Sequence, residues 1–329
     1  MAATPSMRAV VFKGVEQVQV EDRPIPTIRT PRRHCQGDRL CPLRKRPSLV
    51  SRTPKHPYGL RPGHEFAGVI HQLGTQVTDP QVRGPGGCHF HHAVRRVLSL
   101  QEETDQSLRP ELSICAGTRS IDGGQAEYVR VPFASSSLVR KPSEIPSDML
   151  VLMGDIFPTG YFCASRFLKN LDPEEARSAC TVVVGCGPVG MCAIAAASQW
   201  CDNIFAIDMV ADRLEEARRL GAKPIMLTDD PVSKILEATE GRGADHVLEV
   251  VGSAEAMKLC VELARPFACI SSVGVQTSEL TFDGPSLYAK NLTIAWGRCP
   301  CRMKLEQAPE AYKLFNDRKV HKVLFALDA

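Results

Sequence analysis

Residues 180–190 read CTVVVGCGPVG, and this stretch decides the fold of the second half of the chain. Residues 180–184 are apolar at nearly every position, as expected for a strand that is covered on both faces. Gly185, Gly187 and Gly190 follow at the spacing G-x-G-x-x-G, where a helical stretch begins. A strand, a glycine-rich turn and a helix in this order predict the first unit of a parallel βα domain.

Further apolar runs of the same kind follow, and stretches of helical composition separate them. The predicted strands are 180–184, 204–207, 224–227, 247–251 and 267–275. The predicted helices are 188–200, 211–220, 232–239 and 254–264. This alternation predicts the α/β class, with a doubly wound parallel Rossmann sheet over about residues 150–288.

The three glycines of this turn indicate dinucleotide binding. Gly185 permits the tight turn, Gly187 lets the backbone approach a pyrophosphate, and Gly190 lets helix and strand pack closely. The N-terminus of the following helix favours the anion. The alternative is a glycine-rich turn that holds no ligand.

Asp208 favours the binding interpretation, because it ends the next apolar strand 18 residues after Gly190. A carboxylate near this offset accepts hydrogen bonds from ribose hydroxyls and repels a 2′-phosphate, so the sequence predicts NAD in preference to NADP. Arg213, one helical turn onward, is a candidate to stack on adenine or, alternatively, to bind a phosphate.

The first half of the chain is β-rich but interrupted. Residues 7–20, on either side of Gly14, have the apolar pattern of strands. The same pattern occurs again at 63–70 and 123–129. Residues 29–62 and about 80–119 show no periodicity. The first of these segments holds eight Arg, two Lys, six Pro and a single acidic residue, a composition that predicts poor order.

Composition also bounds the compartment and the partners. Thirteen cysteines at irregular spacing do not form a disulfide framework, and no apolar run approaches the roughly 20 residues that a bilayer requires. We therefore expect a cytoplasmic protein with no membrane partner. The basic segment 29–62 has one aromatic residue, Tyr58, for base stacking, so nucleic acid is not an expected partner either.

These motifs together resemble the zinc-containing alcohol dehydrogenases of the medium-chain dehydrogenase/reductase superfamily. The likeness runs through Gly63-His64-Glu65, residues 123–128, residues 155–160 and the Rossmann block. It implies a β-rich GroES-like catalytic domain at 1–149, incomplete here, with a shortened return at 289–329. It also implies hydride transfer between an alcohol or aldehyde and NAD, with zinc as the metal, and an oligomer paired through the edge of the Rossmann sheet.

The resemblance assigns roles to individual residues. His64 corresponds to a zinc ligand, Glu65 to the acid that exchanges onto the metal, and Asp155 to a third ligand. Toward the cofactor, Thr159 and Val189 match the residues that press against the nicotinamide, and Gly274 and Val275 match the backbone that meets its carboxamide. From the residues alone, His64 and Glu65 are equally a surface pair beside a turn, and Asp155 is equally a helix cap.

The chain departs from the family pattern at three places. The first zinc ligand opens Cys-Gly-x-Asp in the family, whereas Cys41, the candidate fourth participant here, precedes Pro42 and Leu43. The lobe that holds a structural zinc in relatives retains only the cysteines Cys88 and Cys115. Three histidines follow Cys88 within residues 89–92, but their spacing matches no known metal-binding motif. A helix and a strand are missing between residues 301 and 305. A non-catalytic NAD-binding protein or degenerate gene product without turnover is therefore the alternative function.

Overall fold

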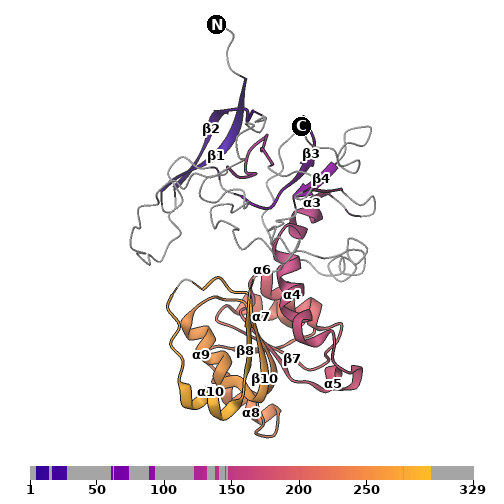
Figure 1. The fold of residues 1–329 in the computed structure, drawn as a ribbon, viewed down its shortest axis with the longest axis vertical. Helices are drawn as coiled ribbons and strands as arrows, with labels where there is room; N and C mark the ends of the chain where they lie inside the picture. Colours follow the sequence, from indigo (N-terminus) through magenta and orange to yellow (C-terminus); the bar gives the residue numbers. More distant parts are fainter. Residues whose placement is uncertain are drawn as a thin grey trace, which may run out of the picture. The chain divides into compact units, whose positions relative to one another are not determined.

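The computed structural model describes residues 5–14, 17–27, 61, 63–73, 89–92, 122–131, 138–140, 145, 147–276 and 278–297. The chain divides into two compact units, Met1–Gly154 with Leu324–Ala329, and Asp155–Val323. Each unit is drawn in Figure 1. Except for Arg61, the basic segment 29–62 lies outside the described residues, and with it Cys41.

The first unit opens with the β-hairpin that the sequence predicts. Strand β1 (Ser6–Gly14) pairs antiparallel with β2 (Gln17–Pro24), with Val10 opposite Val20. Met7, Ala9 and Val11 are buried. Alternate residues of β1 therefore face the interior, which is the period-2 pattern of a half-buried strand.

A second, three-stranded sheet contains β3 (Ala67–Val69), β4 (His89–His92) and β5 (Leu138–Arg140), paired antiparallel in that order. The expectation of no regular structure over 80–119 is wrong at β4. Its backbone pairs with a strand on each side, and such long-range pairing leaves no signal in local composition. The unit ends with helix α3 (Ser147–Leu150) and the 3₁₀ turn η1 (Val151–Met153).

The strand expected over 123–129 is also wrong in the structure. This segment lies beside β1 but makes only the isolated bridge between Ala9 and Ala126. The backbone N–H of Val10 donates to Gln125 O, and that of Glu127 donates to Arg8 O. These few bonds fix the segment against the hairpin without extending the sheet.

The second unit contains a six-stranded sheet in which every neighbouring pair is parallel, in the order β11-β10-β9-β6-β7-β8. The strands are β6 (Thr181–Val184), β7 (Ile204–Asp208), β8 (Lys223–Met226), β9 (Ala244–Glu249), β10 (Ala264–Ser272) and β11 (Thr293–Trp296). This order is that of the doubly wound Rossmann fold, so the predicted α/β fold is confirmed. Residue 288, the expected end of the domain, precedes β11.

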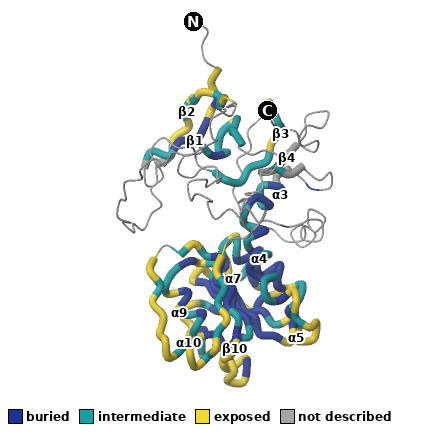
Figure 2. Tube along the Cα trace, in the orientation of Figure 1, coloured by how far each residue is buried: buried dark blue, intermediate teal, exposed yellow. Residues whose placement is uncertain are grey.

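Helices cover both faces of this sheet (Figure 1). They are α4 (Ile156–Leu168), α5 (Pro173–Ser178), α6 (Pro188–Ala197), α7 (Ala211–Arg219), α8 (Pro231–Ala238), α9 (Ala254–Leu263) and α10 (Gly284–Lys290). Buried residues of α4, α6 and α7 form one core cluster, and those of α8 and α9 form another. Strands β6, β7 and β9 are buried between these layers (Figure 2), as their mostly apolar sequence predicts, whereas β8 and β11 are partly exposed.

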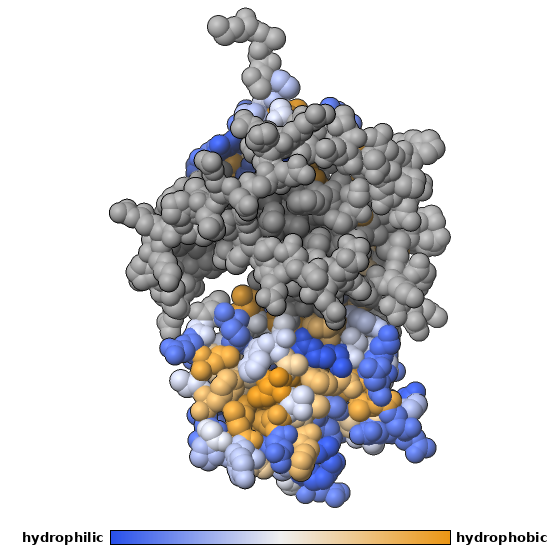
Figure 3. Space-filling view, in the orientation of Figure 1, coloured by the Kyte–Doolittle hydropathy of each residue, from blue (hydrophilic) through white to orange (hydrophobic). Residues whose placement is uncertain are grey.

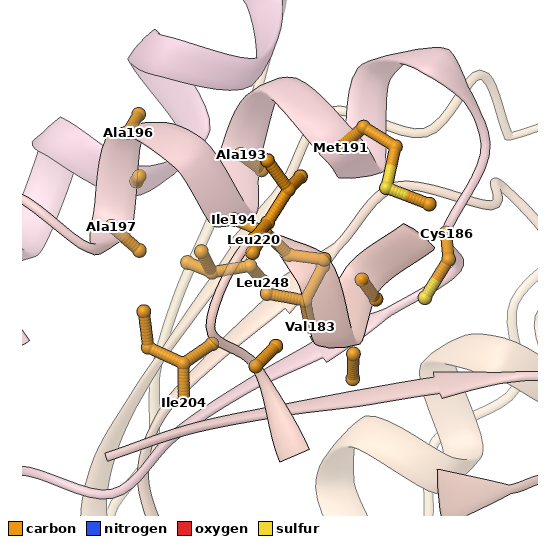
Figure 4. Close-up of a cluster of buried hydrophobic side chains, with 14 of the residues drawn as sticks. Val183, Cys186, Met191, Ala193, Ile194, Ala196, Ala197, Ile204, Leu220 and Leu248 are labelled. Carbon is orange, nitrogen blue, oxygen red and sulfur yellow. The ribbon is translucent and has the colours of Figure 1, made fainter. Parts of the chain in front are cut away.

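Helix α6 is the most deeply buried of these helices. Its residues 190–197 are all buried, and Ile194 packs with Val183 and Leu248 of the sheet (Figure 4). A helix that is apolar all round belongs in a core rather than at a surface. This burial fixes the N-terminus of α6, and therefore the glycine turn ahead of it.

Helix starts follow the sequence signals. Proline occupies the first turn of α5, α6, α8 and α10, where its missing N–H costs nothing. Asp172, Asp230 and Asp283 cap α5, α8 and α10 with side-chain hydrogen bonds. Within the described ranges, no helix has both the length and the apolar character needed to cross a bilayer.

Candidate cofactor site at the carboxyl edge of the sheet

The glycine turn between β6 and α6 shows why each glycine is there. Gly185 has a φ of +98°, and a Cβ on it would lie 2.6 Å from a methyl carbon of Val251. A Cβ on Gly190 would overlap the carbonyl oxygen of Gly185. Gly187 differs, because a Cβ there would meet nothing within 4 Å. Two glycines thus serve the fold, and the middle one faces open space.

Asp208 lies at the carboxyl end of β7, next to this turn. Its side chain is 6% exposed, and its two oxygens accept from the backbone N–H groups of Cys186 (2.7 Å) and Val210 (2.9 Å). The guanidinium of Arg213 lies 3.7 Å from the same carboxylate. The structure therefore brings Asp208 and Arg213 together beside the glycine turn.

Cys186 places a thiol, the side chain with nucleophilic character, in the turn of residues 185–190. Burial, together with the negative charge of Asp208, raises the pKa of this thiol to about 12. At neutral pH it stays protonated, and a thiol is a far weaker nucleophile than a thiolate. Cys186 is consequently a small core residue of the turn and not a catalytic nucleophile.

Helices α4 and α6 approach closely at Gly160. A Cβ on Gly160 would lie 2.5 Å from Cys192 Cβ and 2.7 Å from the carbonyl oxygen of Val189. Only a glycine permits this approach. Gly160, which follows Thr159 in α4, therefore lies against Val189 of α6.

The turns that follow β9 and β10 are in direct contact. A Cβ on Gly274 would overlap the backbone of Gly252, and one on Gly252 would overlap the backbone of Val275. Val275 itself is 64% exposed. The predicted carboxamide segment, Gly274 and Val275, therefore packs backbone to backbone on the neighbouring turn.

Glu249 is the residue of this edge that the sequence analysis missed. It ends β9, its side chain is fully buried, and its carboxylate accepts four hydrogen bonds. A signal was present, because Glu249 ends an apolar strand with a carboxylate as Asp208 does. The predicted strand 247–251 did not end at Glu249, so this prediction did not indicate that Glu249 ends a strand as Asp208 does.

The glycine turn, Asp208, Glu249 and the turn at Gly274 lie at the carboxyl ends of neighbouring parallel strands. Strand β6 lies between β7 and β9 in the sheet. The helix after β6 covers one face, and the helix after β9 covers the other. The connections diverge at this point, and ligands of open α/β sheets bind in such a crevice.

The first unit holds the Gly63-His64-Glu65 motif. The backbone N–H of Gly124 donates to Gly63 O (2.8 Å), and a Cβ on Gly124 would overlap the ring of Phe66. The two glycine motifs of the β-rich region thus pack on each other. His64 and Glu65 are half-buried.

Asp155 begins the second unit and is the N-cap residue of α4, but its side chain makes no capping hydrogen bond. Oδ1 instead accepts from Thr159 Oγ1 (2.7 Å). Among the residues that the structure describes, no three His, Cys, Asp or Glu side chains gather into a metal-binding group. The predicted donor set of His64, Glu65 and Asp155, with Cys41 undescribed, stays a prediction.

This chain is similar to known proteins in sequence and in structure. Residues 188–315 match the family model described as zinc-binding dehydrogenase. The zinc-type alcohol dehydrogenase B of Aspergillus flavus is 36% identical over 99% of this chain and 82% of its own length. The chain belongs to the zinc-containing alcohol dehydrogenase family. The resemblance inferred from the motifs is thereby confirmed.

Two further members of the family extend the likeness. The medium chain reductase/dehydrogenase ucsI of Acremonium sp. is 36% identical over 86% of this chain and 98% of its own length. The solved alcohol dehydrogenase TADH from Thermus sp. ATN1 has a TM-score of 0.68 at 27% identity, covering 94% of this chain and 97% of that one. The likeness therefore spans both units of this family member.

Proposed function

We propose that this chain is an oxidoreductase that transfers hydride between a small alcohol or aldehyde and NAD. The observation that carries the proposal is the buried carboxylate of Asp208 beside the glycine turn. A carboxylate accepts hydrogen bonds from both adenosine ribose hydroxyls, and its charge repels the 2′-phosphate of NADP. Family membership, which implies zinc and NAD(P), supports the reaction class.

The residues present fit a dinucleotide. The open space at Gly187 admits a pyrophosphate, and the N-terminus of the ten-residue helix α6 offers unpaired N–H groups to it. We assign Thr159 and Val189 to the nicotinamide face, and the backbone of Gly274 and Val275 to its carboxamide. Arg213 is assigned to the adenine side. Bound NAD supplies the ring that accepts hydride.

We further propose that zinc is bound by His64, Glu65 and Asp155, with Cys41 as a fourth donor. Nitrogen, carboxylate and thiolate donors suit zinc. No three such donors converge in the described part of the chain, so no step of the reaction is derived through the metal. The corresponding domain proposal assigns residues 1–149 and 289–329 to the GroES-like catalytic domain and 150–288 to the Rossmann domain.

A second candidate is a protein that binds NAD without turnover, or a degenerate gene product. Pro42 and Leu43 favour it, because they stand where the family has a glycine and nearby a hydroxyl that relays the alcohol proton. General acid–base relays contribute about 10²–10⁴-fold to rates. The loss of one such group would by itself slow turnover by that factor.

The test separates binding from turnover. Fluorescence titration should show NADH binding at least about tenfold tighter than NADPH, a difference of about 1.4 kcal/mol. Tighter or equal NADPH binding overturns the assignment of Asp208. Alcohol oxidation at about 1–10³ per second across primary, secondary and polyol substrates supports the enzyme. NADH binding without turnover, and without about one zinc per chain, supports the second candidate.

We also propose a homo-oligomer formed through the edge of the Rossmann sheet. Strand β11 is an edge strand, and exposed edges invite pairing with another chain. Trp296, the last residue of β11, is 44% exposed and packs edge-to-face on Phe282, while Tyr288 of α10 is 87% exposed. Apolar residues also gather in the middle of the face of this unit that Figure 3 shows. Sedimentation of the purified chain measures the oligomeric state.

A further inference from the structure

Glu249 is a charged side chain with no exposure to solvent at the carboxyl end of β9. Its Oε1 accepts from the backbone N–H groups of Val251 (2.8 Å) and Gly252 (2.6 Å). Its Oε2 accepts from Ser272 Oγ (2.6 Å) and Gln276 Nε2 (3.2 Å). Burying a carboxylate is costly unless donors replace its water, and here four donors do so.

The two oxygens bind two different turns. Oε1 holds the turn that follows β9, and Oε2 holds the end of β10 and the turn after it. The backbone carbonyl of Glu249 adds a third tie, because it accepts from the N–H of Val273 (3.0 Å). One side chain therefore fixes the spacing between the two turns in which Gly252 and Gly274 pack on each other.

We propose that Glu249 is a positioning residue for the nicotinamide half of the cofactor site. In this role, Glu249 holds the backbone of Gly274 and Val275 in the position in which it meets the carboxamide. The inference rests on the proposed NAD-binding function and adds a residue to it. Glu249 touches no cofactor atom in this account and acts entirely through the two turns.

The substitution Glu249→Gln is selective for this role. Its amide oxygen still accepts from the N–H groups of Val251 and Gly252. Its NH₂ group then faces Ser272 Oγ, which can accept, and Gln276 Nε2, which is itself a donor. Gln276 keeps a hydrogen bond to position 249 only if its own side-chain amide turns its oxygen toward the new NH₂ group, while the turn after β9 stays held.

The matched control is Asp245→Asn, at the opposite end of the same strand. Asp245 also accepts from a backbone N–H, that of Cys180 (2.8 Å), and from the side chain of Arg265. It lies at the amino end of β9, away from the proposed cofactor edge. A general loss of strand stability would therefore affect both variants.

The experiment measures Kd for NADH and for AMP, which lacks the nicotinamide. We expect Glu249→Gln to raise Kd for NADH about tenfold, as loss of one buried hydrogen bond allows, and to leave Kd for AMP unchanged. Asp245→Asn should change neither. Ser272→Ala, which removes only one donor, should raise Kd for NADH about threefold and serves if Glu249→Gln does not fold.

Four outcomes overturn the inference. Equal weakening of NADH and AMP binding assigns Glu249 a general structural role, and so does an equal effect of Asp245→Asn. Unchanged NADH binding in Glu249→Gln and Ser272→Ala removes the role while leaving the proposed function intact. Failure of the unsubstituted protein to bind NADH, although it is folded, overturns the proposed function and this inference together.

Discussion

The carboxylate of Asp208 accepts a hydrogen bond from the backbone N–H of Cys186 across 2.7 Å. This bond ties the carboxyl end of β7 to the glycine turn after β6. The residue proposed to select the cofactor thus also holds the turn proposed to bind its pyrophosphate. If the proposed function holds, one hydrogen bond joins the residue proposed for the ribose to the turn proposed for the pyrophosphate.

Replacing Asp208 with Asn should reduce the preference for NADH over NADPH. The amide removes the negative charge that repels a 2′-phosphate, and it retains only one acceptor oxygen for Cys186 and Val210. We expect Kd for NADH to rise about tenfold and Kd for NADPH to fall or stay unchanged. The control is Asp212→Asn, a neighbouring exposed carboxylate, and an equal effect of that variant would contradict the assignment.

Gly187→Ala and Gly190→Ala should fail in different ways. A Cβ at position 187 meets no protein atom within 4 Å, so Gly187→Ala should keep its Tm and lose NADH binding. A Cβ at position 190 overlaps Gly185 O, and overpacking of this kind costs about 1–3 kcal/mol of stability. Thermal unfolding and NADH titration of the two variants check this. A large loss of Tm in Gly187→Ala would argue against an open cofactor path.

The stability of the protein should fall as the pH drops below about 6.5, in part because of His246. Burial lowers the pKa of its imidazole, and its Nδ1 has no hydrogen-bond partner among the residues that the structure describes. The unfolded chain therefore takes up a proton at a pH where the folded chain does not, and unfolding is favoured.

The pH effect is measured by urea unfolding at pH 7.5 and pH 5.5. His246→Leu should lose less free energy of unfolding between these values than the unsubstituted protein, by up to about 1 kcal/mol. Asp245, whose pKa is lowered by hydrogen bonds to Arg265 and Cys180 that outweigh its burial, acts at a lower pH. Identical pH dependence of stability in the two proteins would show that His246 does not contribute to it.

Lys290 should stabilise the end of α9. Its Nζ donates to the carbonyl oxygens of Val261 (2.8 Å), Glu262 (3.1 Å) and Ala264 (2.7 Å), which the helix leaves unpaired. Lys290→Met should lower the free energy of unfolding by about 1–2 kcal/mol. Lys258→Met, at an exposed lysine of α9, should change the free energy of unfolding by less than about 0.5 kcal/mol. Similar values for both variants would show that the cap contributes nothing.

Local sequence determined the core of the second unit. The five predicted strands and four predicted helices of 180–275 all occur, because an apolar run covered on both faces and a glycine turn leave local signals. Asp208 was also found from local spacing. In contrast, β4 was missed, because three histidines in a strand are held by pairing with β3 and β5 and not by their own propensity.

The limits of the apolar runs were decided by tertiary contacts. The sequence extends β9 through residue 251, but the strand ends at Glu249, because its carboxylate takes the N–H groups of Val251 and Gly252. The predicted strand 267–275 likewise ends at Ser272, where the following turn packs on the one after β9.

The sequence by itself determined the parallel fold, the glycine turn and the acidic residue beside it, because each is a pattern of neighbours along the chain. Only the tertiary structure decided that Gly160 lies against Val189 and that Glu249 joins two turns. Those contacts depend on the close packing of α4 on α6 and of Gly252 on Gly274. Such backbone approaches between distant segments arise from the assembled sheet and its helices, which no local pattern encodes.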